Sequence, residues 1–209
     1  MSPIFTDAFG AGAGVLASPW TQAALSARTL NYDGSGSAKA SAADASFDVI
    51  AYDGVNVYSP DQYGQITIAG GLSSGVQFAE VFVRCSGVTG TFKGYQFLTD
   101  GVTGAAHTEL WSYSGGSGTL LRNFATTFTT GDVMRIEVVG TIITCYKNGA
   151  SLGTQASSVA TVGAPGIGVF NSATNAVLLD SFVGDNIGQS ALRVLGRTSS
   201  YMGSRMGLR

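Results

Sequence analysis

Charge is scarce in this sequence of 209 residues: charged residues make up only 11% of it, and the formal net charge at pH 7 is -2. Such a chain gives no electrostatic reason to expect binding to nucleic acid or to an anionic membrane. No apolar run approaches the roughly 18 residues that suggest a membrane span. The opening residues "MSPIFTDAFGAG" lack the basic and apolar segments of a secretory signal. Either the protein is made in a cytoplasm or a signal has been removed, and the initial methionine favours the first. We expect neither nucleic acid nor membrane as a partner.

Cysteine and histidine are also rare, with two and one copies. Two cysteines are too few for a disulfide framework or a structural zinc site. The sequence leaves the pairing of Cys85 and Cys145 open, but because free cysteine is usually buried we expect two buried free thiols. His107 would have to serve any histidine-dependent catalytic triad, and no serine stands in a "GxSxG" turn. We expect it to be a surface or edge histidine.

Glycine is abundant, with 30 copies against 4 prolines, which indicates many tight turns. The segment "GDVMRIEVVGTIITCYKNGASLG", residues 131 to 153, shows the pattern most clearly. Residues 133 to 139 alternate apolar and polar side chains, which predicts a half-buried strand, and residues 141 to 147 form a second such run. Asn148-Gly149 supplies the positive φ angles that a two-residue hairpin turn needs.

Further short strands are expected along the rest of the chain, without a long helix between them. Their ranges are 4–9, 47–52, 63–69, 76–84, 95–99, 108–113, 119–125, 166–170 and 177–183. Strands at this spacing with glycine-rich loops indicate a sandwich or barrel rather than βαβ units. In the fourth of these strands one face is predicted to point inward, comprising Ala79, Val81, Val83 and Cys85. The opposite face mixes aromatic and charged side chains, namely Phe78, Glu80, Phe82 and Arg84.

The order of several segments points to a known fold. "FTDAFG" is followed by "SPWTQ", "DQYGQITIAG", "AEVFVRCSG…KGYQF", "LLRNF", the hairpin, "GAPGIGVF" and "LLDSFVGDNI". This order, which covers residues 4 to 187, resembles the concanavalin A-like lectin/glucanase jelly roll, including its laminin-G-like members. The resemblance implies an all-β fold, a two-sheet antiparallel jelly-roll sandwich, with a lectin-like domain at residues 1–187. Because that fold hosts enzymes, lectins and structural modules, it does not decide the activity.

Catalytic carboxylates are not apparent in the sequence. Retaining glucanases of the resembling superfamily carry an "ExDxxE"-type run on one strand, because nucleophile and acid must lie about 5 Å apart. The three glutamates Glu80, Glu109 and Glu137 are far apart, although aspartates such as Asp100 and Asp132 can approach one by folding. We therefore predict that the protein is not an enzyme.

A sugar site is the next hypothesis, because a pyranose stacks on an exposed aromatic ring while polar side chains bind its hydroxyls. Trp111 and Tyr113 share one strand face with Glu109, and Tyr95 and Phe97 share a face of the preceding strand. If the two strands are neighbours, we expect a glycan-binding platform of Tyr95, Trp111 and Tyr113. The alternative is that these rings fill an ordinary sandwich core.

Calcium is the only cofactor for which the sequence offers candidate ligands. The resembling families sometimes hold this ion near the first and last strands, where Asp7 and Asp180 are found, and oxygen ligands suit it. Two aspartates without further acids are more often turn or strand-end residues. We expect no cofactor, with Asp7 and Asp180 as the ligands if calcium is bound.

The last 22 residues differ from the rest of the chain. Residues 188–209 contain four arginines and no acid, while the remainder holds 7 basic and 13 acidic residues. This basic amphipathic segment is either a frayed terminus or an extended C-terminal arm that docks onto a partner. The residues expected to carry the docking are Leu192, Arg193, Arg197, Tyr201, Arg205, Met206 and Arg209.

Taken together, these features predict a non-enzymatic virion structural protein of a tailed bacteriophage, either a capsid decoration or a tail-associated protein. Its partners would be other virion proteins or copies of itself, and a surface glycan. The alternative is a soluble carbohydrate-binding module, which needs no arm and should present a groove with exposed aromatic rings. The sequence leaves open the choice between capsid and tail, the host, the glycan and the oligomeric state.

Overall fold

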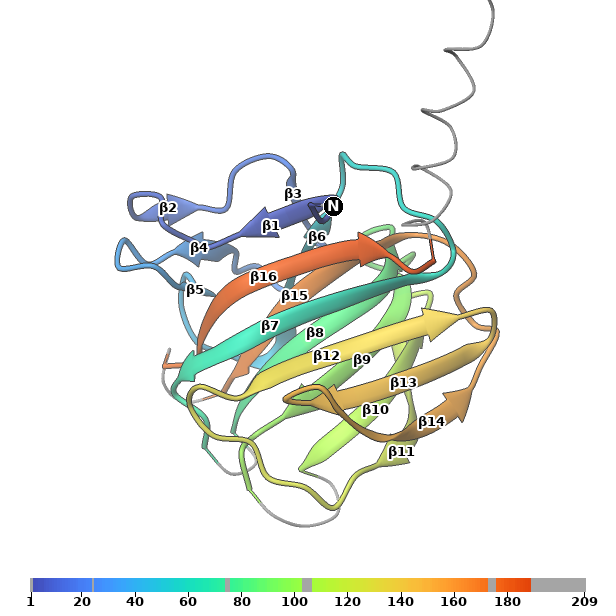
Figure 1. Cartoon of the computed structure of the whole chain (residues 1–209). Helices are drawn as coiled ribbons and strands as arrows, with labels where there is room; N and C mark the ends of the chain where they lie inside the picture. Colours follow the sequence, from blue (N-terminus) through green and yellow to red (C-terminus); the bar gives the residue numbers. More distant parts are fainter. Residues whose placement is uncertain (1, 24, 74–75, 103–106, 173–175, 189–209) are drawn as a thin grey trace, which may run out of the picture.

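The computed structural model describes residues 2–23, 25–73, 76–102, 107–172 and 176–188. These residues form sixteen β-strands and no helix, so none of them provides a helix able to cross a membrane. The strands build two antiparallel sheets that pack face to face (Figure 1). The predicted all-β sandwich is therefore confirmed. Every strand ends by Asn186, and the predicted arm residues from Leu192 to Arg209 lie outside the described part of the chain.

The first sheet has nine strands in the order β14-β13-β12-β7-β16-β5-β4-β2, and β1 also pairs with β16. Their bounds are β1 Phe5–Asp7, β2 Gly14–Val15, β4 Leu30–Tyr32, β5 Ala38–Ala40, β7 Gln62–Gly70, β12 Val133–Val139, β13 Ile142–Lys147, β14 Ala150–Ala156 and β16 Leu178–Asn186. The second sheet has seven strands in the order β11-β10-β9-β8-β15-β6-β3. Their bounds are β3 Trp20–Gln22, β6 Asp44–Asp53, β8 Gln77–Ser86, β9 Lys93–Thr99, β10 Thr108–Ser114, β11 Ser117–Asn123 and β15 Ala164–Asn171.

The main core fills the space between the two sheets, because alternate residues of each strand face the opposite sheet. Ile66 and Ile68 from β7 pack there with Val81 and Val83 from β8 and with Phe97 from β9. All five side chains are fully buried. Burial of each such side chain contributes roughly 1.5–3 kcal/mol, so this layer supplies much of the stability that holds the sheets together.

The hairpin of β12 and β13 has the predicted geometry. The two strands pair from Met134 opposite Lys147 to Val139 opposite Ile142. Asn148 and Gly149, with φ angles of 50° and 80°, form the turn that follows β13. The side chain of Asn148 adds two contacts, because its Oδ1 accepts a 2.8 Å hydrogen bond from the backbone N–H of Val133 and its Nδ2 donates to Asp132 at 2.6 Å.

Strand β8 departs from the predicted alternation at Arg84. Its pairing with β9 shifts register between Val83 and Ser86, and Arg84 has a φ of 55°. This bulge turns Cys85 onto the other face of the sheet, where it packs in a small cluster with Phe82 and Phe92. The prediction that Cys85 faces the main core is therefore wrong. Both cysteines are buried and free, as expected.

We expect Gly149→Val to lower the free energy of unfolding by about 1 kcal/mol or more, because a β-branched residue is strained at positive φ. A Cβ at this position meets no atom within 4 Å, so the cost is in the backbone alone. Gly149→Asn is the control, since asparagine tolerates this conformation and should cost much less. Denaturant unfolding checks both variants, and equal losses would contradict the assigned turn.

The contacts of Asp132 lead us to expect that the free energy of unfolding falls in acid. Partial burial raises the pKa of its carboxyl, but hydrogen bonds from Asn148 and Thr129 and contact with Lys147 outweigh this effect and lower the pKa to about 2. Because the folded pKa lies below the unfolded value of about 3.9, the contribution is complete above that value and is lost as pH falls toward 2. Because solvent screens a carboxyl this close to the surface, we expect a loss of only about 1 kcal/mol across this window. Denaturant titrations of wild type and Asp132→Asn would refute this if their pH profiles were parallel.

Candidate functional site

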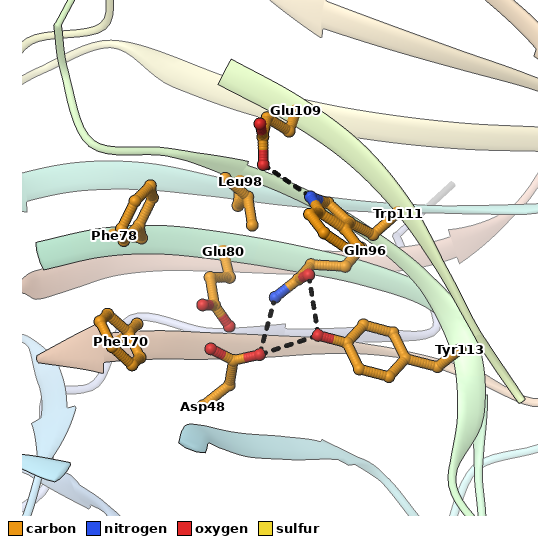
Figure 2. Close-up of a pocket in the computed structure, with 9 residues that line it drawn as sticks. All are labelled: Asp48, Phe78, Glu80, Gln96, Leu98, Glu109, Trp111, Tyr113 and Phe170. Carbon is orange, nitrogen blue, oxygen red and sulfur yellow. Dashed lines mark hydrogen bonds between the residues drawn. The ribbon is translucent and has the colours of Figure 1, made fainter. Parts of the chain in front are cut away.

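A cavity of about 250 Å³ opens on the outer face of the seven-stranded sheet, the face turned away from the main core (Figure 2). Side chains from five strands, β6, β8, β9, β10 and β15, line it. They are Asp48, Phe78, Glu80, Gln96, Leu98, Glu109, Trp111, Tyr113 and Phe170. The site therefore combines aromatic and apolar surfaces with carboxyl and amide groups.

Cross-strand pairing explains why these side chains meet. Glu80 on β8 lies opposite Leu98 on β9, which in turn lies opposite Glu109 on β10. One row further along the sheet, Gln96 lies opposite Trp111. Residues in one row project from the same face of a sheet, so strands far apart in sequence contribute to a single surface.

Gly168 on β15 makes room for one of the carboxyl groups. It pairs with Glu80, and a Cβ at this position would lie only 2.4 Å from Oε2 of Glu80 and 2.8 Å from the ring of Phe82. No ordinary Cβ fits at such distances, so the glutamate side chain depends on the glycine opposite it. The burial of Glu80 is thus built into the pairing of β8 with β15.

The aromatic wall of the cavity is held by Trp111, whose side chain is half-buried. Its indole N–H donates a 2.7 Å hydrogen bond to Oε2 of Glu109, which fixes the orientation of the ring. Phe78 and Phe170 pack edge to face at 5.9 Å on the opposite side of the site (Figure 2). These rings offer apolar faces to a bound molecule, while Glu109 keeps an oxygen beside them.

The polar floor consists of two carboxyl groups that face each other, those of Asp48 and Glu80 (Figure 2). Oδ2 of Asp48 accepts a hydrogen bond from the Tyr113 hydroxyl at 2.9 Å and from Nε2 of Gln96 at 3.3 Å. Glu80 is fully buried beside the carboxyl of Asp48 and the amide of Gln96, which both affect its pKa, but no donor of the described residues reaches its oxygens in hydrogen-bond geometry. An unpaired buried carboxyl is costly as an anion, so it favours the protonated form.

Both acids of the floor bind their protons more tightly than usual. Burial raises the pKa of Glu80 well above its ordinary value, and the neighbouring Asp48 raises it further. Burial also raises the pKa of Asp48, although hydrogen bonding, first of all from Tyr113, opposes that shift. The pKa of the Tyr113 hydroxyl is raised by burial and by the charge of Asp48. Both shifts favour a form in which at least one of the two adjacent carboxyls is protonated.

Two of the three predicted glycan-binding rings line the cavity, and the third does not. Trp111 and Tyr113 lie on the outer face, but Tyr95 lies on the inner face and is fully buried in the main core. Its hydroxyl oxygen accepts a 3.0 Å hydrogen bond from the backbone N–H of Ala160. Including Tyr95 was therefore wrong, because the register places Gln96 beside Trp111.

His107 lies at the start of β10, outside the cavity, and 27% of its side chain is exposed. Its Nδ1 is 2.7 Å from Oδ2 of Asp100, whose side chain is buried. His107 is therefore partly exposed, next to a strand that lies between β9 and β11 rather than at the edge of its sheet. Neither residue is part of the cavity lining.

The proposed calcium ligands lie in paired strands, since Asp7 on β1 faces Phe182 on β16. The carboxylate of Asp7, however, accepts hydrogen bonds from the N–H of Phe9 at 2.7 Å, the indole of Trp20 at 2.8 Å and the hydroxyl of Tyr32 at 3.3 Å. No group of three potential metal-binding side chains occurs in the described ranges. Asp7 is thus used by protein donors, and with Asp180 it does not fit a calcium site.

No protein-family model matches this sequence, and no curated protein matches it. Solved structures do match. A protein of unknown function with a galectin-like fold from Bacillus subtilis is 9% identical, with a TM-score of 0.61, over 89% of this chain and 96% of that one. A prokaryotic β-1,3-1,4-glucanase (lichenase) derived from a mouse hindgut metagenome is 11% identical, with a TM-score of 0.61, over 88% and 99%.

The carbohydrate-binding module CBM66 from Bacillus subtilis is 15% identical, with a TM-score of 0.55, over 83% of this chain and 97% of that one. The fold is that of the concanavalin A-like jelly roll. The resemblance predicted from the order of segments is thereby confirmed for the fold. At these identities the likeness extends to the fold alone, which in the matched proteins carries both binding and catalysis.

Proposed function

We propose that this protein binds a carbohydrate in the cavity on the outer face of the seven-stranded sheet. The observation that carries the proposal is the half-buried ring of Trp111, fixed by Glu109, beside the polar groups of Gln96 and Asp48. A sugar ring presents an apolar face and several hydroxyls at once, so it needs both kinds of surface within a few ångströms. The cavity offers both.

The comparisons support this proposal over the virion structural role expected from the sequence. One matched structure is a carbohydrate-binding module, and another is a β-glucanase, so proteins that handle carbohydrates recur on this fold. Because the likeness is one of fold, its support is indirect. The residues of the cavity provide the direct support.

Binding fits the carboxyl groups of the cavity better than hydrolysis does. Folding brings Asp48, Glu80 and Glu109 together from three strands, a cluster that the sequence alone did not reveal. A glycosidase needs a carboxyl that reaches the glycosidic oxygen. The oxygens of Glu80 are sealed from solvent, and one oxygen each of Asp48 and Glu109 is engaged by neighbouring donors. We therefore propose that the protein is not an enzyme.

A second proposal, docking into a larger assembly, has one observation in its favour. Large apolar side chains are exposed near the point where the chain leaves β16, on two loops that approach Arg84 and at the strand ends that flank Gly140. They are Val57, Val139, Ile142, Val159 and Val162. The backbone N–H of Ile187 donates to the carbonyl of Asp61 at 2.9 Å, which places the exit of the chain beside these loops. The virion context, its protein partners and the virion location remain predictions from the sequence.

Trp111→Ala should weaken binding to a glycan by about tenfold or more, because it removes the stacking surface, whereas Trp111→Phe should retain part of the affinity. A glycan array on the full chain identifies the ligand, and calorimetry measures each variant. Val139→Ala is the control, since this residue is exposed on the other sheet. Unchanged affinity in Trp111→Ala would refute the proposal, and release of reducing sugar by the wild-type protein would refute its non-catalytic part.

Deleting residues 189–209 should leave the melting temperature close to that of the full chain, because all sixteen strands lie upstream. If the segment docks onto a neighbouring copy, the full chain should be an oligomer and the truncated chain a monomer. Light scattering after gel filtration measures both masses. Equal masses would contradict the docking role of the arm.

A further inference from the structure

The charged side chains that line the cavity are all acidic. Asp48, Glu80 and Glu109 contribute three carboxyl groups, and no lysine, arginine or histidine belongs to its lining. The hydrogen-bond donors that reach Asp48 and Glu109 are neutral groups of Tyr113, Gln96 and Trp111. None of the ion pairs in the described ranges involves these three acids. A cation is therefore the kind of group that this lining lacks.

The burial of Glu80 is a second observation, separate from the number of acidic side chains in the cavity. It is fully buried at the floor of the cavity, and its two oxygens have no hydrogen-bond partner in the described part of the chain. Gly168 keeps open the space that its carboxyl occupies. Buried carboxyls are normally paired or hydrogen-bonded, and a positive charge that comes close to a buried one stabilises it through space, without direct contact.

The aromatic side chains suit an ammonium group attached to a sugar. Trp111, Phe78 and Phe170 line the same cavity as the acids, and aromatic faces attract cations as well as the apolar faces of sugar rings. An ammonium group brings three hydrogen-bond donors and no acceptor, which matches a floor made of carboxyl oxygens. The volume of about 250 Å³ is just below the ~300–1,000 Å³ of typical small-molecule pockets, so the cavity admits a sugar unit or two.

We propose that this cavity selects carbohydrates that carry a protonated amine, amino sugars, over neutral sugars, with the ammonium group directed at the carboxyl pair of Asp48 and Glu80. The proposal rests on the proposed function and specifies its ligand class. The ring of the amino sugar packs on Trp111, and Glu109 provides a further acceptor at the wall of the cavity. Neutral sugars make the stacking contact but leave the floor unpaired.

Binding of the cation should release a proton. The titratable groups around the pair are Asp48 and Asp44 from β6, Glu80 from β8, and Glu109 and Tyr113 from β10, while β9 and β15 present Gln96 and Phe170. Burial and mutual repulsion make the pair hold a proton, because two adjacent carboxylates are unfavourable. An ammonium group placed beside them favours the doubly ionised form. The proton then leaves to the buffer, which a neutral ligand does not cause.

Calorimetry of the full chain at about pH 6 compares three tetrasaccharides that differ only at the second carbon of each unit: β-1,4-linked glucosamine, N-acetylglucosamine and glucose. We expect the amine to bind at least about tenfold tighter than the other two, corresponding to 1.4 kcal/mol. In buffers of different ionisation enthalpy, its apparent binding enthalpy should reveal proton release. The two neutral ligands should show none.

Glu80→Gln tests the floor directly, because it keeps the shape of the side chain and removes its charge. We expect the preference for the amine to fall to within about threefold, with proton release lost. Asp180→Asn makes the same change in net charge on the other sheet and should leave the preference intact. If Glu80→Gln does not fold, Glu109→Gln should reduce the preference at least about threefold instead.

The outcomes separate this inference from the proposed function. Equal affinity for all three tetrasaccharides overturns the selectivity but leaves carbohydrate binding in place. An amine preference without proton release, or one unaffected by Glu80→Gln, places the cation elsewhere and also overturns the inference. Failure of all three to bind overturns it too, whereas the glycan array and the Trp111 variants decide the fate of the broader function.

Discussion

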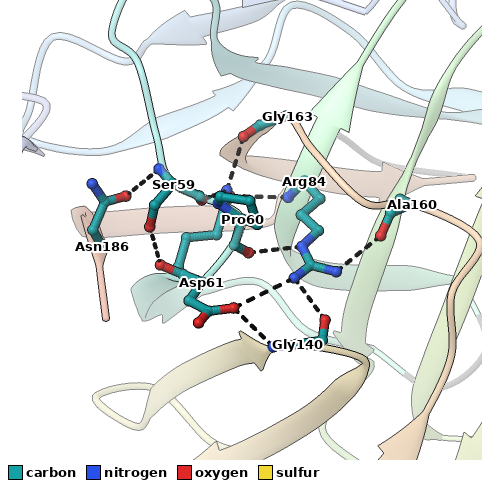
Figure 3. A network of polar contacts seen from close by, with 9 residues as sticks. Ser59, Pro60, Asp61, Arg84, Gly140, Ala160, Gly163 and Asn186 are labelled. Atoms are coloured by element: carbon teal, nitrogen blue, oxygen red, sulfur yellow. Dashed lines mark hydrogen bonds and ion pairs between the residues drawn. The ribbon is translucent and has the colours of Figure 1, made fainter. Parts of the chain in front are cut away.

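The buried guanidinium of Arg84 connects one end of the sandwich across both sheets (Figure 3). It donates hydrogen bonds to the carbonyls of Pro60 at 2.8 Å, Ala160 at 3.0 Å and Gly140 at 2.8 Å, and Asp61 lies 3.8 Å away. These carbonyls belong to three different connections, and leaving each unpaired would cost about 1–3 kcal/mol. The positive φ of Arg84 aims the side chain at them, so the bulge in β8 and the closure of this end depend on the same residue.

The cavity lies on the part of β8 that precedes the bulge. Residues of β8 before Arg84 keep a regular alternation, which places Glu80 on the outer face, while Cys85 beyond the bulge packs against Phe82 and Phe92. The two buried charged side chains of β8 then differ in one respect. Arg84 has protein acceptors at each of its nitrogens, whereas the oxygens of Glu80 have no donor in the described residues. Arg84 therefore has a structural role, whereas the carboxyl of Glu80 is the group on which the proposed ligand selectivity depends.

Sequence patterns predict the structure well where neighbouring residues along the chain determine it. The alternation of residues 133–139 and the Asn148-Gly149 turn specify strand, face and hairpin without distant contacts. The two- and three-residue strands β2 to β5 are too short to show a period. Tyr95 was assigned to the wrong face because alternation separates two faces without saying which one meets the other sheet. Asp48, Glu80 and Glu109 are brought together by pairing between distant segments, which the sequence pattern does not show. The one local signal is Glu80 itself, an acidic residue between Phe78 and Phe82 on a single strand face.

The burial of Glu80 bears differently on two possible activities of the cavity, hydrolysis of a sugar and attraction of a cation. Proton transfer to a leaving group requires contact between the acid and the reacting oxygen. Attraction of a cation requires only proximity in a medium of low dielectric constant, where charges a few ångströms apart interact more strongly than in water. The carboxyl of Glu80, whose oxygens are buried and lie close to Gly168, suits the second requirement better than the first. The two proposals, binding without hydrolysis and selection of a cation, therefore depend on the burial of the same carboxyl.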